Sequence, residues 1–516
     1  MSTLHAEHRK LVFLFCICSC LASCSSLPTS SDRVDTFSIS NPENTRAGRL
    51  FQDGVRTHPG RSGLHLLEDG NTAFLVRNAM GGIAEKTIDV QYYIWEGDRS
   101  GMLLFHRLLE AAKRGVRVRV LIDDFTQNAN DFDLAAFDKL PNVEIRLFNP
   151  FSHRNTKPLG FITDISRVNH RMHNKLFVMD NTLAVVGGRN IADAYFGFSN
   201  EYNFRDLDLL AAGDVVKDIS SSFDQYWNSP WAYRAADIYR KDQSATDIDT
   251  LTRELSAAVE NMGDSFPFSA DIDADAMYAQ LEAFLPQFDW VNVEVLFDSP
   301  GKVVGDGIAL REKILAQLGG INTEVSAELA YFVPGKSGLK RIKALTDSGI
   351  KIRVLTNSMA SNDVLAAHSG YASYRKRLLA AGVDLYEYKP DADQRRSYTG
   401  PRGSAESRLH TKAFVIDRKL TFIGSFNFDP RSIHLNTEVG LLIDNRAFSE
   451  KVLRLMAIGR SGANSYKLDY HGKNHHIIWV ELLGTKTKTY QHDPKTSWWQ
   501  RVKVNLLRIL PIEQHL

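Results

Sequence analysis

The stretches HNKLFVMD (residues 173–180) and HTKAFVID (residues 410–417) decide the fold, because one pattern stands twice in a single chain. In each stretch a His is followed two positions later by a Lys and five positions after that by an Asp. One match to so short a pattern is weak, since about 0.05 accidental matches are expected in a chain of this length. Two matches with the same filler of small polar and apolar residues indicate a repeated unit.

The sequence around each copy extends the repeat. GGRN (187–190) follows the first copy, GSFN (424–427) follows the second, and the interval from His to Asn is the same. Two further pairs of segments correspond upstream, KRGVRVRVLIDD (113–124) with DSGIKIRVLTNS (347–358) and NVEIRLFNP (142–150) with GVDLYEYKP (382–390). The chain is therefore an internal duplication of a unit larger than a solenoid repeat, and we expect its two halves to pack face to face.

Within each half, strand patterns alternate with a helix pattern. Buried-strand patterns at 87–95 and 116–124 flank a helix predicted over 101–115, which ends at a glycine. The second half repeats this order with strands at 325–333 and 350–357 and a helix around 338–348. Strand–helix–strand units favour a parallel sheet covered by helices. The sequence predicts an α/β fold of two pseudo-twofold-related, mainly parallel or mixed sheets flanked by helices, with the functional site at their interface.

The repeat boundaries divide the chain into six segments. These are a signal segment (1–23), a tether (24–60), an N-terminal half (61–213), a helical connector (214–285), a C-terminal half (286–465) and a tail with an amphipathic helix (466–516).

The predicted helix of the tail begins at SWWQ (497–500), which has the pattern of a capping box. Trp498, Val502, Leu506 and Ile509 fall on one face of this helix. Such a face suits a membrane interface or docking on the body of the protein, and we favour docking.

The charge of the chain is nearly balanced, with a formal net charge of +1 over 516 residues. This balance argues against a protein that a strong basic field holds on nucleic acid. A local basic cleft stays compatible with it.

The N-terminus has the pattern of a targeting segment. Basic residues precede the apolar run LVFLFCICSCLA (11–22), which is too short to span a membrane. LASC, which ends at Cys24, resembles a bacterial lipobox, whose Cys is lipidated and becomes the first mature residue. Ser25 follows, which favours the outer over the inner membrane by the sorting rule of enteric bacteria. We expect a membrane-anchored lipoprotein facing the periplasm, with a plain signal peptide or an uncleaved anchor as alternatives.

All four cysteines lie in this N-terminal segment. The mature chain would therefore have no thiol for a disulfide, a zinc site or catalysis.

The repeated motif brings chemically active side chains together. Alternation along a strand places the His and the Lys of each motif on the same side, and the next strand delivers an Asn to the same edge. The two halves together supply two imidazoles, two ammonium groups and two carboxamides, from His173, Lys175, Asn190, His410, Lys412 and Asn427. The two Lys and two Asn can bind the oxygens of a substrate phosphate, while one imidazole attacks phosphorus and the other protonates the leaving oxygen.

A nucleophilic His must be neutral, with a carboxylate that fixes its tautomer. Asp206 in FRDLDLL and Glu438 in NTEVGLL take corresponding places in the duplication, so both are candidates for orienting a motif His. Asp208 is the alternative to Asp206.

Other residues near the motifs have expected structural roles. Asp180 and Asp417 stand at turn-like positions and are assigned to holding the strand end. The small residues at 187–188 and 424–425 are expected to let the backbone approach the phosphate. Four residues end strands on the site side and can either read a headgroup or cap the sheet: Trp95, Glu96, Asp123 and Asp124.

The two motifs resemble those of the phospholipase D superfamily, whose signature is HxKxxxxD twice per site, and the resemblance covers nearly the whole mature chain. Four segments are more specifically similar to bacterial cardiolipin synthases of the C type: QYYIWEGDRSG (91–101), VNHRMHNKLFVMDN (168–181), GGRNIADAYF (187–196) and LPIEQHL (510–516). The resemblance implies a duplicated phospholipase D fold and a phosphohistidine intermediate formed without metal. It also implies that His173 is the nucleophile and His410 the acid and then the base, an order that the residues alone leave open.

The leading hypothesis is a phosphatidyltransferase that makes cardiolipin from phosphatidylglycerol and a second phospholipid or glycerol. A phospholipase D hydrolase that releases phosphatidic acid shares every site residue and is the alternative. A phosphodiester nuclease fits less well, because the small nucleases of this superfamily carry one motif and dimerise. We expect no cofactor and no metal, phospholipids and a membrane as partners, and no nucleic acid; an accessory protein is left open.

Overall fold

The computed structural model describes residues 27–28, 34–125, 134–152, 157, 160, 164–239, 248–263, 266–268, 273–305, 309–393, 405–471 and 476–509. The predicted signal segment, with Cys24 and Ser25, lies outside these residues, as does the LPIEQHL motif at 510–516. None of the helices described is both long enough and apolar enough to cross a membrane.

Eight of the strands described in the N-terminal half form a mixed sheet. Across the sheet they are β9 (Ala232–Arg234), β4 (Val143–Phe148), β3 (Arg117–Asp123), β2 (Thr87–Tyr92), β5 (Leu176–Met179), β6 (Leu183–Gly187), β8 (Asp208–Ala212) and β1 (Ser62–Leu67). The pairs β2–β3 and β3–β4 are parallel, as the strand–helix–strand pattern predicts, and the other pairs are antiparallel.

The C-terminal half repeats this arrangement. Its strands run in the order β10 (Asp289–Phe297), β17 (Val439–Asp444), β16 (Leu420–Gly424), β15 (Lys412–Ile416), β11 (Glu324–Leu329), β12 (Lys351–Asn357), β13 (Asp384–Tyr388), β18 (Ser465–His471), β19 (His476–Leu483) and β20 (Lys486–Tyr490). Ile88 lies opposite Met179 in one half and Val325 opposite Ile416 in the other, so the register counted from each motif His is the same. The predicted mixed α/β duplication is confirmed.

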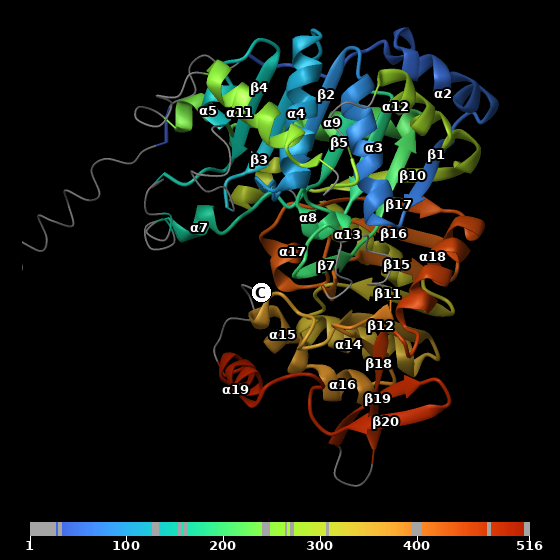
Figure 1. Ribbon diagram of the computed structural model, residues 1–516. Helices are drawn as coiled ribbons and strands as arrows, with labels where there is room; N and C mark the ends of the chain where they lie inside the picture. Colours follow the sequence, from blue (N-terminus) through green and yellow to red (C-terminus); the bar gives the residue numbers. More distant parts are fainter. Residues whose placement is uncertain are drawn as a thin grey trace, which may run out of the picture.

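The two halves join edge to edge and also pack face to face. β1 pairs antiparallel with β10, which makes one sheet of 18 strands. One hydrophobic core combines residues from both halves with the helices α9 (Asp214–Trp227) and α18 (Arg446–Gly459). Figure 1 shows the N-terminal half above and the C-terminal half below.

Each half also has an outer core under its covering helices. α3 (Gly70–Ile83) and α4 (Arg99–Lys113) cover the N-terminal sheet, and α13 (Ala309–Gln317) and α14 (Gly335–Asp347) cover the C-terminal sheet. The predicted helices at 101–115 and 338–348 are α4 and α14. Asp69 and Asp98 cap α3 and α4 by accepting hydrogen bonds from backbone N–H groups of the first turn.

The remaining helices connect these elements. They are η1 (Pro42–Asn44), α2 (Arg46–Thr57), α5 (Leu134–Phe137), α7 (Ile165–Val168), α8 (Asp193–Phe196), α10 (Ala235–Ile238), α11 (Ile248–Glu260), α12 (Ala274–Glu282), η4 (Leu285–Gln287), η5 (Pro300–Val304), η6 (Leu318–Gly320), α15 (Leu365–Ala372), α16 (Arg375–Ala380), α17 (Pro430–His434) and α19 (Trp498–Leu507). The predicted connector packs on the N-terminal half, with α11 against α4 and α12 against α3.

Two terminal segments differ from the sequence prediction. Part of the predicted tether forms α2, because Ala47 and Phe51 lie one turn apart and bury their side chains, Phe51 against Phe288. The predicted tail begins with β18, which extends the C-terminal sheet next to β13.

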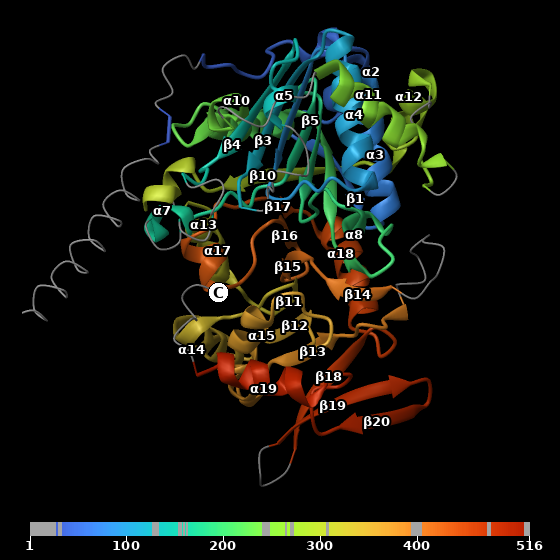
Figure 2. The same ribbon diagram turned by 60° about the vertical axis from the view of Figure 1, so that its left-hand side comes forward.

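The last helix, α19, has the predicted capping box between Ser497 and Gln500. It packs on α15, and its one fully buried side chain is Val504. Most of the predicted apolar face is exposed, since Trp498 is 60%, Leu506 60% and Ile509 80% exposed, while Val502 is half-buried. Figures 1 and 2 both show α19 beside α15.

Candidate active site

A short parallel pairing between the halves positions the second motif. β7 (Tyr202–Arg205) pairs with β14 (Glu406–Leu409), and the next N–H, that of His410, donates to the carbonyl oxygen of Arg205 at 2.8 Å. The residues that directly follow two paired parallel strands lie next to each other. Asp206 and His410 are those residues, and the distance from His410 Nδ1 to Asp206 Oδ2 is 2.6 Å.

A matching bridge positions the first motif. Met172 pairs in parallel with Thr437, and the N–H of His173 donates to the carbonyl oxygen of Thr437 at 2.9 Å. The following residues again meet, with 2.8 Å between His173 Nδ1 and Glu438 Oε2.

Each imidazole is therefore oriented by a carboxylate from the other half. Both contacts use Nδ1, so the Nδ1–H donates to the carboxylate and Nε2 keeps its lone pair when the ring is neutral. His173 is 7% exposed and His410 is 5% exposed, so the two rings sit in a nearly closed site.

The two motif Lys residues are buried next to the imidazoles. Lys175 Nζ donates to the carbonyl oxygen of His173 at 2.6 Å, and Lys412 Nζ donates to that of His410 at 2.5 Å. Burial lowers the pKa of Lys175 well below its ordinary value and that of Lys412 to about 8. The charge of Lys412 also lowers the pKa of Lys175, as expected if both ammonium groups face one space.

Both imidazoles are neutral near pH 7 when the site is empty. Burial, followed by the charge of Lys175, lowers the pKa of His173 to about 4 even though Glu438 opposes this shift. Burial and the charges of Lys412 and Lys175 lower the pKa of His410 well below its ordinary value. The site therefore contains two neutral imidazoles beside the positively charged side chains of the two motif Lys residues. This combination suits an anionic phosphodiester.

The two carboxylates have different surroundings. Glu438 accepts a hydrogen bond from Ser425 Oγ at 2.5 Å; burial favours its neutral form, but His173 and Lys175 outweigh burial and lower its pKa. Burial raises the pKa of Asp206 to about 7.

The small residues before the Asn have a role in packing. A Cβ on Gly188 would lie 2.3 Å from Asp206 Oδ1, and one on Gly424 would lie 2.3 Å from the carbonyl oxygen of Val439. These glycines make room for the neighbouring strand and for the orienting carboxylate, and the approach of the backbone to a phosphate stays a prediction.

The two predicted phosphate-binding Asn residues are placed unequally. Asn190 Oδ1 accepts from Ile94 N at 3.2 Å, and its Nδ2 donates to the Tyr195 hydroxyl at 2.8 Å. Asn427 Oδ1 is buried without a hydrogen-bond partner among the described residues. Asn427 therefore has the more available amide.

Three aromatic residues contact the histidines and were missed from the sequence. The ring of Tyr93 lies 5.1 Å from that of His173, and the rings of Tyr195 and Phe204 each lie 5.1 Å from that of His410. Tyr93 and Tyr195 stand inside segments quoted for the resemblance, but the corresponding positions of the second half hold Ala330 and Ser432, so the duplication could not point to them.

The Asp residues of the motifs hold backbone at the strand ends. Asp180 accepts hydrogen bonds from the N–H groups of residues 85–87, and Asp417 accepts from those of residues 322–324. Both have positive φ, 51° and 50°. Their geometry is that of turn residues outside the cluster of imidazoles and ammonium groups.

Of the four residues at strand ends, three form hydrogen bonds inside the protein and the fourth lies at the surface. Asp123 accepts from the N–H groups of Met172 and Phe125, each at 2.8 Å, and so fixes the chain just before His173. Asp124 accepts from Phe151 N at 2.8 Å, and the indole of Trp95 donates to Gly101 O at 3.2 Å. Glu96 is exposed.

Asp208, the alternative to Asp206, is committed elsewhere. It is buried and pairs with Arg77 at 2.8 Å and Arg189 at 3.3 Å. Within the described part of the chain, no group of three or more His, Cys, Asp or Glu side chains could hold a metal ion.

Comparison with known proteins gives a family. A family model described as "Cardiolipin synthase, PLD-like domain" matches residues 82–227 and 314–457, one match in each half. The chain belongs to this family. It is an enzyme of the phospholipase D superfamily, and the two matched stretches contain both motifs.

Individual relatives agree with this membership. Cardiolipin synthase C of Escherichia coli (strain K12) is 41% identical over 478 residues, covering 88% of this chain and 96% of the relative. An uncharacterized protein of Helicobacter pylori (strain ATCC 700392 / 26695) is 32% identical, covering 97% of this chain and 98% of the relative. The crystal structure of phosphatidylserine synthase from Haemophilus influenzae Rd KW20 matches with a TM-score of 0.55 at 12% identity, over 91% of this chain and 100% of that one, which shows a shared fold.

Proposed function

We propose that this protein is a phosphatidyltransferase that makes cardiolipin from phosphatidylglycerol and a second phospholipid. The observation that carries the proposal is the pair of crossed His–carboxylate contacts beside two buried Lys residues. The similarity to cardiolipin synthase C supports the choice of product.

In the first step, the phosphate oxygens of the donor phospholipid lie between Lys175 and Lys412. His173 attacks phosphorus through Nε2, while its Nδ1–H stays on the ring and donates a hydrogen bond to Glu438. The bond from phosphorus to the headgroup oxygen breaks, and His410, protonated once the anionic phosphate offsets the charge of the two Lys residues, gives its Nε2 proton to that oxygen. The headgroup alcohol leaves, and the phosphatidyl group stays on His173.

In the second step, His410 acts as a base instead of an acid. Neutral His410 takes a proton from a hydroxyl of the phosphatidylglycerol headgroup, whose oxygen attacks phosphorus. The bond between phosphorus and Nε2 of His173 breaks, which releases cardiolipin, leaves His173 neutral and returns His410 to the protonated form in which it began. Asp206 stabilises the imidazolium form of His410 in each step.

The proposed setting is a membrane that faces the periplasm, with the outer membrane favoured. The support for it is the LASC segment, in which Cys24 would carry the lipid and Ser25 would direct sorting. A lipidated N-terminus would keep the enzyme at the surface that supplies both phospholipids.

Mass spectrometry of lipids tests the proposed reaction. The purified protein is incubated in detergent with phosphatidylglycerol alone and with phosphatidylglycerol plus phosphatidylethanolamine, beside a His173→Ala control. Cardiolipin that forms only with the unmodified protein supports the proposal. Phosphatidic acid without cardiolipin would identify a hydrolase instead, and neither product would reject both.

A further inference from the structure

The C-terminal half contains an apolar cavity that the catalytic scheme does not use. Its volume is 320 Å³, within the range of about 300–1,000 Å³ typical of ligand sites. It lies on the outer face of the sheet under α13 and α14, and its floor includes Val325, Ala327, Leu329, Ile352, Val354 and Phe414. A cavity lined in this way repels water and accepts hydrocarbon.

The duplication shows why the cavity exists. Because the register is the same in both halves, Ala327, opposite Phe414, takes the place that Val90 has opposite Phe177. By the same register Leu329 takes the place of Tyr92, and Phe332, bridged to Phe428, takes the place of Trp95, bridged to Ile191. Smaller side chains therefore stand in the C-terminal half at three corresponding positions, 327, 329 and 332.

The helices that cover this face are also shorter. Over the residues that the structure describes, α3 and α4 have 14 and 15 residues, whereas α13, which begins directly after the undescribed residues 306–308, has 9 and α14 has 13. Val90 and Tyr92 are 0% exposed, whereas Ala327 is 5% and Leu329 is 4% exposed. The N-terminal half fills its outer core with its own side chains, whereas the outer core of the C-terminal half leaves space for a ligand.

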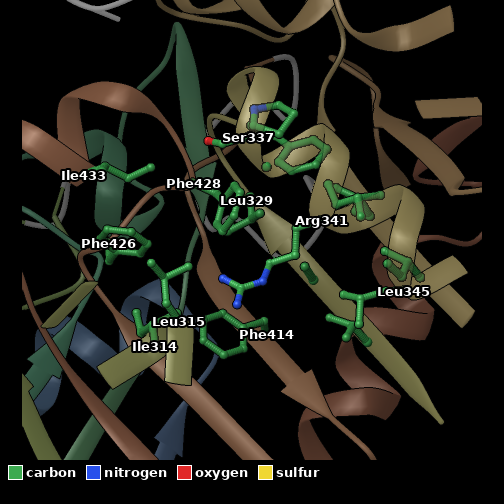
Figure 3. A pocket seen from close by; sticks show the side chains of 18 of the residues that line it. Ile314, Leu315, Leu329, Ser337, Arg341, Leu345, Phe414, Phe426, Phe428 and Ile433 are labelled. Carbon is green, nitrogen blue, oxygen red and sulfur yellow. The ribbon is translucent and has the colours of Figure 1, made fainter. Parts of the chain in front are cut away.

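Two arginines give the cavity a polar end. Arg311 on α13 and Arg341 on α14 line it, and Arg341 is exposed whereas Arg311 is half-buried. Figure 3 shows the guanidinium of Arg341 reaching toward Leu315 and Phe414. Neither arginine forms a hydrogen bond or an ion pair within the described part of the chain. An apolar lining that includes two unpaired cations fits a hydrocarbon chain that ends in an anionic group.

We propose that this cavity binds one acyl chain of an anionic membrane phospholipid, whose phosphate meets Arg311 and Arg341. The site is separate from the His–Lys cluster, so the proposal goes beyond the reaction proposed above and does not depend on it. Phe426 and Phe428 line the cavity and flank Asn427. A bound chain would therefore pack against the segment that carries this active-site amide.

Photocrosslinking tests the proposal. The full-length protein is mixed with vesicles of phosphatidylglycerol that carries a diazirine in one acyl chain, and the labelled residues are identified by peptide mass spectrometry. Matched arms use phosphatidylcholine with the same chain and a free diazirine fatty acid. Labelling of residues on β11, α14 or the 426–428 segment by phosphatidylglycerol is expected. Labelling by the fatty acid alone, equal labelling by phosphatidylcholine, or labelling only elsewhere would overturn the proposal.

Three variants sharpen the test. Arg341→Ala should lower cavity labelling about tenfold, as the loss of a charge-assisted contact predicts, and Lys340→Ala on the same exposed helix should not change it. Ala327→Ile should fill the cavity and abolish labelling, with a melting temperature at least equal to that of the unmodified protein as the check on folding. Unchanged labelling in Arg341→Ala, or in a folded Ala327→Ile protein, would contradict the site.

Discussion

At the scale of single residues, each motif histidine depends on a carboxylate from the other half of the chain. Glu438 holds His173 and Asp206 holds His410. This crossing means that neither half contains a complete imidazole–carboxylate pair of its own.

Substitution of the carboxylates tests this dependence. Glu438→Gln keeps the size of the side chain but cannot stabilise an imidazolium or fix the same tautomer, so kcat should fall about 10²- to 10⁴-fold. Asp206→Asn should have a similar effect, and Glu282→Gln, at an exposed position on α12, should have none. Turnover assays check this, and activity within twofold of the unmodified protein in Glu438→Gln would show that the contact is not functional.

The charge of Lys412 sets the expected alkaline limit of activity. Burial lowers the pKa of Lys412 to about 8, so its positive charge is present below that pH and is lost as the pH rises through it. The value of kcat/KM should therefore fall above about pH 8. Arginine keeps its charge at every accessible pH, so Lys412→Arg should move this limb upward in the pH profile. If the alkaline limb of the profile stays at the same pH in Lys412→Arg, the ionisation of another group causes it.

At the scale of elements, the repeated strands and helices were predictable because their apolar periodicity is strong and occurs twice. β2, α4 and β3, and then β11, α14 and β12, lie where the patterns placed them. The pairing of β7 with β14 was not predictable, because each strand has four residues and the contact joins positions that are 204 apart in sequence. The sequence named Asp206 and Glu438, but only the folded structure shows which His each one meets.

Helix α19 shows a further limit of periodicity. The pattern identified its apolar face but not its contact with the body, which is made through Val504 on another face. Burial of this single side chain and the contact between Arg508 and Ser373 hold the helix, and they leave both tryptophans exposed.

The exposed tryptophans should help the protein bind membranes, since indole rings favour the interface. In a Cys24→Ser background, a Trp498→Ser, Trp499→Ser double variant should bind anionic vesicles at least about tenfold more weakly. Val304→Ser, at another exposed apolar site, serves as the control and should bind normally. Vesicle sedimentation measures the change, and equal binding by the double variant would assign no membrane role to this helix.

At the scale of the whole molecule, the duplication places two copies of one motif in a single site. Figure 2 shows the two halves stacked, with the N-terminal sheet above and the C-terminal sheet below. The similarity between the halves also reveals where they differ: the outer core of the C-terminal half is less filled, and its amide at Asn427 is less engaged. Such differences depend on packing, so the motif pattern alone could not predict them.

The N-terminal anchor is a prediction at the same scale. If Cys24 is lipidated, Cys24→Ser should move the protein from the membrane fraction toward the soluble fraction or block its processing. Turnover of detergent-dispersed lipid by the purified variant should change little, because the lipid holds the enzyme near its substrate and takes no part in the chemistry. Full membrane association with normal processing would show that another segment is the anchor.

The central claim is that both halves form one active site, and the turnover of two single variants tests it most directly. Because the first half supplies the proposed nucleophile and the second supplies the acid and base, His173→Ala and His410→Ala should each lose nearly all activity, at least about 10³-fold. Melting temperatures near that of the unmodified protein would establish that both variants are folded. If either folded variant kept about half of the activity, two independent sites would be present and the account would be contradicted.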